Sequence, residues 1–83
     1  MRKIGLDARA LEHPQPLEMA MKILQTLEEN SYLYMLHRKK PLPLLDLAKK
    51  HKLSSYLQED KNKNWHIIIS KNTNEDLSQY IDV

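Results

Sequence analysis

Two stretches of the sequence combine proline with histidine or lysine, residue types that begin helices and bind anions or metal ions. His13-Pro14-Gln15-Pro16 precedes one amphipathic segment, and Lys40-Pro41-Leu42-Pro43 precedes a second. Arginine can form paired hydrogen bonds with a carboxylate or a phosphate, and helix N-termini favour negative charge. The sequence therefore predicts a site for a small anion or an acidic partner segment, with these candidate residues: Asp7, Arg9, Glu12, His13, His37, Arg38 and Lys40.

Other interpretations of these residues stay open. Asp7 and Arg9 could pair with each other or hold their loop, as short polar loops commonly do. His13 and His37, with Asp7 or Glu12, would be enough ligands for zinc or iron, which gives the alternative of a metal- or haem-linked binding or sensor domain. Spacing alone does not establish such a site, unlike a His-Glu-x-x-His pair on one helix face. We assign no cofactor and no metal, and keep the two histidines as candidates.

The reactive side chains of the sequence do not form a recognisable catalytic set. There is no cysteine, which excludes disulfides, thiolate zinc sites and cysteine nucleophiles. Carboxylates and histidines are present, but no Ser/His/Asp order, phosphate loop or ligand cluster is specific enough to assign a reaction. We therefore expect a protein without enzymatic activity.

The elements that must position the candidate residues follow from apolar periodicity and proline placement. We predict strands over residues 2–6, 32–37, 54–59 and 65–70, and helices over residues 15–29 and 42–52. The prolines suit the first turn of each helix. Residues 71–83 are predicted to be a tail or a short C-terminal helix. A chain of 83 residues is expected to form a single domain, residues 1–83.

The order β-α-β-α-β-β predicts an α/β (α+β) two-layer sandwich, with a four-stranded mixed sheet and two helices on one face. Right-handed crossovers between parallel strands would bring both proline loops to the carboxyl edge of the sheet. Two helices cover only one sheet face. The large residues Tyr32, Tyr34, Trp65 and Ile68 either face the helices or lie on the other face, where the tail or a second copy in a homodimer would cover them.

The segment Leu6-Asp7-Ala8-Arg9-Ala10-Leu11-Glu12-His13-Pro14-Gln15-Pro16-Leu17 resembles the opening of the TusA/SirA sulfur carriers, where Asp-x-Arg-Gly-Leu leads into Cys-Pro-x-Pro. Pro41-Leu42-Pro43-Leu44-Leu45 and Trp65 are more similar to the cysteine-less branch of that superfamily, an uncharacterised domain of unknown function. The resemblance implies the same fold up to the end of the last predicted strand. His13 stands at the position of the persulfide cysteine, and imidazole cannot form a persulfide. Sulfur transfer is therefore not implied for this chain.

The predicted function is a non-enzymatic accessory or interaction module that docks a protein partner or a small anion at the helix N-terminal edge. The 13 basic and 11 acidic residues, with a net charge of +2, argue against nucleic-acid binding. No apolar run approaches the ~20 residues of a membrane span, and the N-terminus becomes charged too soon for a signal peptide. We therefore predict a cytoplasmic protein. His51 and His66 are predicted to be surface histidines.

Overall fold

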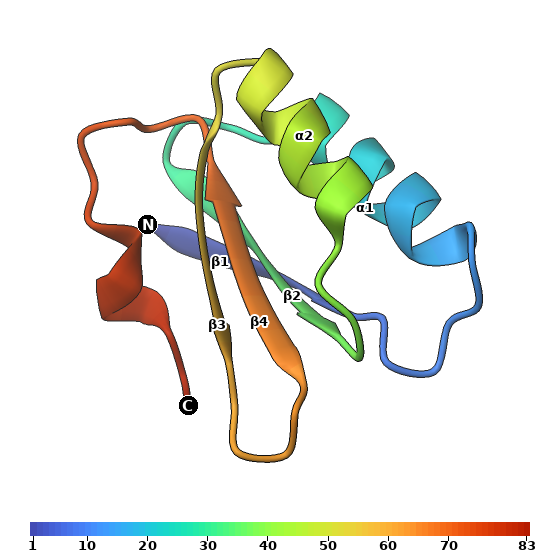
Figure 1. The fold of residues 1–83 in the computed structure, drawn as a ribbon. Coiled ribbons are helices and arrows are strands. Elements are labelled where there is room, and N and C mark those ends of the chain that lie inside the picture. Colours follow the sequence, from blue (N-terminus) through green and yellow to red (C-terminus); the bar gives the residue numbers. More distant parts are fainter.

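A computed structural model describes residues 1–83 (Figure 1). The elements, in chain order, are β1 (Arg2–Asp7), α1 (Gln15–Gln25), β2 (Ser31–His37), α2 (Leu42–Lys50), β3 (Ser54–Glu59), β4 (Trp65–Ser70) and the 3-10 helix η1 (Leu77–Tyr80). One sheet has the strand order β1-β2-β4-β3; β1 is parallel to β2, and β4 is antiparallel to both β2 and β3. Both helices cover the same face, which confirms the predicted two-layer α+β sandwich.

The main core lies between the helices and the sheet. Alternate strand residues point to this face, as the period of two requires, so Leu33 and Met35 of β2 meet Ile67 and Ile69 of β4 there. All four are fully buried. The complete cluster is Leu6, Ala8, Ala20, Leu24, Leu27, Leu33, Met35, Leu44, Ala48, Ile67 and Ile69.

The first helix is shorter than the sequence pattern indicates: it ends at Gln25, where we expected residue 29. Its last turn tightens, because the Thr26 and Leu27 amides donate to carbonyls three residues back, at 3.2 and 3.3 Å. Leu27 still packs in the core from this turn. The helical spacing of apolar residues therefore extends to Leu27, beyond the last residue of the helix, which is why the predicted end was too late.

The second helix ends at Lys50, and its end requires a left-handed residue. Lys52 has φ 59°, the Leu53 amide donates to the Ala48 carbonyl at 2.9 Å, and the Lys52 amide donates to the Lys49 carbonyl at 3.1 Å. This is a Schellman ending in which lysine occupies the position that usually holds glycine, at some conformational cost. Neither helix has the length and apolar character needed to cross a bilayer.

The opposite face of the sheet is covered by the C-terminal tail (Figure 1). Tyr32, Tyr34 and Ile68 point to this face and pack with Leu77 of η1. Trp65, in contrast, packs against the helix-side core. The large residues that the sequence left unassigned are therefore divided between the two faces. A homodimer through this face stays a prediction, since the chain's own tail lies over it.

Candidate functional site

The two proline-containing loops meet at the carboxyl edge of β1 and β2, as the parallel pairing of these strands requires. Residues 11–17, which lead from β1 into α1, and residues 37–44, which lead from β2 into α2, contribute to one pocket of about 330 Å³. Five of the seven predicted residues line it: Glu12, His13, His37, Arg38 and Lys40.

The floor of this pocket is apolar and its rim is basic. Pro16, Met35 and Leu44 are buried and close the bottom. Arg38, Lys39 and Lys40 are exposed on the rim, and none of them forms an ion pair, since the two ion pairs in the chain involve other residues. Glu12 is the only carboxylate among the lining residues. The rim therefore carries an excess of uncompensated positive charge.

His37 is a neutral hydrogen-bond donor in this pocket. Its Nδ1 accepts the amide proton of Lys39 at 2.9 Å, which leaves the hydrogen of a neutral ring on Nε2. Partial burial lowers the pKa of His37, and the positive charge of Arg38 lowers it further. At neutral pH the ring can thus donate one hydrogen bond to an acceptor in the pocket.

The helix N-termini at the pocket offer fewer amides than helix starts usually do. Pro16 and Pro43 carry no N–H, and the amides of Gln15 and Leu42 donate to carbonyls of their own loops, at 2.8 and 3.0 Å. One amide in each first turn makes no hydrogen bond within the chain, that of Leu17 in α1 and that of Leu44 in α2. Side chains therefore supply most of the donors of the pocket.

Asp7 and Arg9 lie outside this pocket and bind each other. The Arg9 guanidinium donates to the two carboxylate oxygens of Asp7 at 2.8 and 2.7 Å, and its amide donates to Asp7 Oδ1 at 3.2 Å. This pairing, one of the two interpretations left open by the sequence, lowers the pKa of Asp7 to about 2. Two of the five N–H groups of the Arg9 guanidinium, one on Nε and one on Nη2, are thus engaged by Asp7.

The metal or haem alternative stays a prediction. His13 and His37 line the same pocket, but no group of three or more metal-ligating side chains comes together in the chain. The Nδ1 of His37 is occupied by the Lys39 amide. Binding a metal through the other ring nitrogen would first require loss of its hydrogen.

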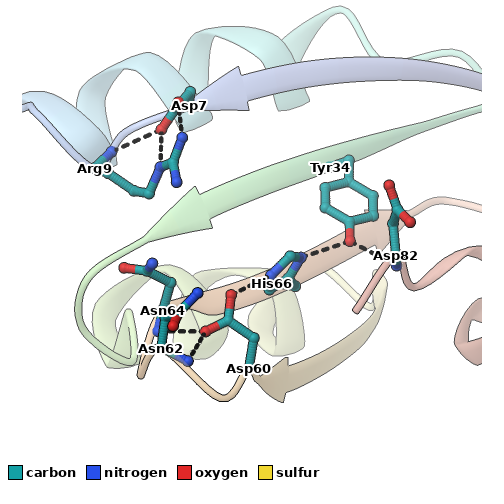
Figure 2. A network of polar contacts seen from close by, with 8 residues as sticks. All are labelled: Asp7, Arg9, Tyr34, Asp60, Asn62, Asn64, His66 and Asp82. Carbon is teal, nitrogen blue, oxygen red and sulfur yellow. Dashed lines mark hydrogen bonds and ion pairs between the residues drawn. The ribbon is translucent and has the colours of Figure 1, made fainter.

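A second polar arrangement was not predicted: His66 is buried, and its prediction as a surface histidine was wrong. His66 lies on the tail face of β4, with 8% of its surface exposed. Its ring nitrogens contact Tyr34 Oη at 2.7 Å and Asp60 Oδ2 at 2.9 Å (Figure 2). The alternation of strand residues placed His66 on the same face as Ile68, but only the presence of the tail makes that face an interior one.

The turn between β3 and β4 fixes Asp60 for this contact. Asp60 Oδ1 accepts the amides of Asn62 and Asn64, at 2.8 and 3.0 Å, while Oδ2 meets His66 (Figure 2). The hydrogen bond from His66, followed by those from the two amides, lowers the pKa of Asp60. The carboxylate is therefore ionised at neutral pH and acts only as an acceptor.

Comparison with known proteins agrees with this architecture. The model of the family described as "Uncharacterized conserved protein (DUF2249)" matches residues 5–71. The crystal structure of a SirA-like protein from Desulfitobacterium hafniense is similar to this chain, with a TM-score of 0.70, 20% sequence identity, and coverage of 82% of this chain and 96% of that chain. A search of curated proteins finds no match. The chain is thus a member of the DUF2249 family of uncharacterised conserved proteins, with a SirA-like fold and no cysteine.

Proposed function

We propose that the chain is a non-enzymatic binding module that docks an anionic group in the pocket between the two proline-containing loops. The anionic group would belong to a free small anion or to an acidic side chain of a protein partner. The observation that carries the proposal is the basic rim: Arg38, Lys39 and Lys40 have no carboxylate partner, and they surround a pocket with an apolar floor.

The rim and the floor favour different parts of a ligand. The guanidinium of Arg38 can form two parallel hydrogen bonds with a carboxylate or phosphate, and the neutral His37 ring can donate a third. Lys40 is held near the pocket because its ammonium group lies over the Trp65 ring, 5.7 Å from the centroid. The buried floor formed by Met35 and Leu44 would accept a short apolar group.

Removal of one rim charge tests the proposal. Arg38→Ala should weaken binding of the anion roughly tenfold, which is the scale of one charge-assisted hydrogen bond. The matched control is Arg9→Ala, which removes the same charge from a residue that Asp7 already binds. Binding is measured by amide chemical-shift changes of the pocket residues during titration.

Three probes distinguish the sources of the anion: sodium phosphate, a short aliphatic carboxylate and a glutamate-rich peptide. Binding of the phosphate or the carboxylate supports a free small anion, and binding of the peptide alone supports an acidic partner segment. In both cases the affinity should fall as salt is added, because exposed charges are screened. The proposal is contradicted if none of the three probes causes chemical-shift changes, or if Arg38→Ala and Arg9→Ala lower the binding affinity equally.

A further inference from the structure

The C-terminal tail is fastened to the sheet by a small number of contacts. Leu77 is buried, and the Tyr80 ring stacks on Tyr32 with a centroid separation of 4.7 Å. Farther along, the Asp82 amide donates to Tyr34 Oη at 2.9 Å. The family model ends at residue 71, so these contacts come from a part of the chain that lies beyond the matched domain.

The hydrogen bonds continue from Asp82 and Tyr34 through His66 to Asp60, and the positions of their hydrogen atoms follow from the groups at the two ends. The Asp82 amide can only donate, so Tyr34 Oη accepts at that side; the ionised Asp60 carboxylate can only accept, so His66 Nε2 donates to it. A neutral His66 then has a bare Nδ1, which accepts the Tyr34 hydroxyl at 2.7 Å. Burial raises the pKa of the Tyr34 hydroxyl, which keeps its proton available for this bond. In this row of hydrogen bonds from Asp82 through Tyr34 and His66 to Asp60, every donor has an acceptor (Figure 2).

Protonation of His66 would disrupt this arrangement at the hydrogen bond between His66 and Tyr34. Both ring nitrogens would then donate, and Nδ1 would direct its hydrogen at Tyr34 Oη. The hydroxyl hydrogen would have to leave that side, and the other hydrogen-bonded side of the oxygen already faces the Asp82 amide. Either the Asp82 amide would then face a second donor, or the hydroxyl hydrogen would lose its only acceptor, while the bond from His66 to Asp60 would become a charged and stronger one. Acid would therefore tighten the turn and loosen the tail.

The charged groups that face His66 come from the turn after β3, from β1 and from the tail. Asp60 approaches from the turn after β3, and three ionisable residues share a hollow with His66 and Tyr34 on this side of the sheet. These are Lys3 and Asp7 of β1 and Asp82 of the tail. Asp7 is paired with Arg9, so the groups left are the carboxylates of Asp60 and Asp82 against the ammonium of Lys3. The Lys3 ammonium lies over the Tyr34 ring, 4.4 Å from its centroid, rather than in an ion pair.

We propose that the tail is a pH-dependent cover of the second sheet face, released when His66 is protonated. Closed at neutral pH, the tail buries the aromatic side chains of β2. Opened in acid, it exposes them while the helix-covered core stays folded, since that core consists only of apolar side chains. The switch involves other residues than the basic pocket, so its test is independent of the test of the proposed function.

A spin label at the end of the tail tests this. The chain has no cysteine and Val83 is exposed, so a nitroxide on Val83→Cys in the full chain labels only the tail. Between about pH 8 and about pH 5, the range in which imidazoles gain a proton, the mobile fraction of the label should rise roughly threefold or more. Circular dichroism in the same samples reports whether the domain remains folded.

Variants of the hydrogen-bonded chain give distinct expectations. His66→Gln can accept from Tyr34 and donate to Asp60 but does not titrate, so its label should stay immobile over the whole range. Tyr34→Phe removes the acceptor of the Asp82 amide, so in this variant the label should be mobile at every pH. The matched control is His51→Gln, which removes an exposed histidine and should behave as the unsubstituted chain.

The proposal is overturned if the label in the folded, unsubstituted chain keeps the same mobility when nuclear magnetic resonance shows that His66 is protonated. It is overturned equally if His66→Gln retains the acid-induced rise. Should that variant fail to fold, the midpoints in the unsubstituted chain decide: a label transition that does not follow the titration of the His66 ring excludes the switch.

Discussion

The face of the sheet covered by the helices and the face covered by the tail bury different kinds of side chain. The helix face holds leucine, isoleucine, methionine and alanine. The tail face holds, beside Ile68 and Leu77, two tyrosines and a histidine whose ring makes two hydrogen bonds. Apolar contacts are non-directional and tolerate small shifts, whereas each buried hydrogen bond requires a specific partner atom. The first face is therefore held by apolar burial, and the second depends in part on specific hydrogen bonds.

The largest effect expected from this comparison is on the helix face. Leu33→Ala removes a fully buried side chain of a central strand and should lower the free energy of unfolding by ~2–5 kcal/mol, because the cavity closes only in part. Urea denaturation measures the loss. Leu42→Ala, at a position that is 57% exposed, is the control and should cost less than ~0.5 kcal/mol. A similar cost at both positions would show that the helix face is misassigned as the main core.

An intermediate effect is expected on the tail face. Leu77→Ala also truncates a buried leucine, but the loss is limited to the free energy that docks the tail, so we expect only ~1–2 kcal/mol. Amide hydrogen exchange should show faster opening of residues 77–82 with little change in β2 and β4. A loss as large as that of Leu33→Ala would mean that the two faces fold as one cooperative unit, and the comparison would fail.

The smallest effect concerns the exposed pair at the edge of the tail face. The folded pKa of Asp7 is about 2, against an ordinary value of 3.8. The stabilisation by this pair is therefore fully present above the ordinary value and is lost as pH falls through the folded pKa. Arg9→Ala should move the Asp7 titration midpoint, measured by nuclear magnetic resonance, toward 3.8. Both side chains are about half exposed, so stability at neutral pH should hardly change. An unchanged midpoint would show that Arg9 does not set the pKa of Asp7.

The position of the candidate pocket was predictable as far as strand direction determines it. Two proline-marked loops that follow parallel strands must reach the same sheet edge, so Glu12, His13, His37 and Arg38 could be grouped before any coordinates were known. The pairing of Asp7 with Arg9 could be named only as one of two alternatives. Loop backbone angles decide whether such a pair closes on itself or faces a ligand, and residue spacing does not encode them.

The sequence by itself determined the order of the elements, the apolar stripes and the absence of cysteine, because these depend on local periodicity and on residue type. Tertiary structure decided where α1 ends, that the tail covers the aromatic face, and that His66 is buried. The contacts of Tyr34 show the reason. Asp82 and Tyr34 are separated by 48 residues along the chain, and His66 and Tyr34 by 32. Contacts over such separations arise only when the whole chain is packed, so no local pattern records them.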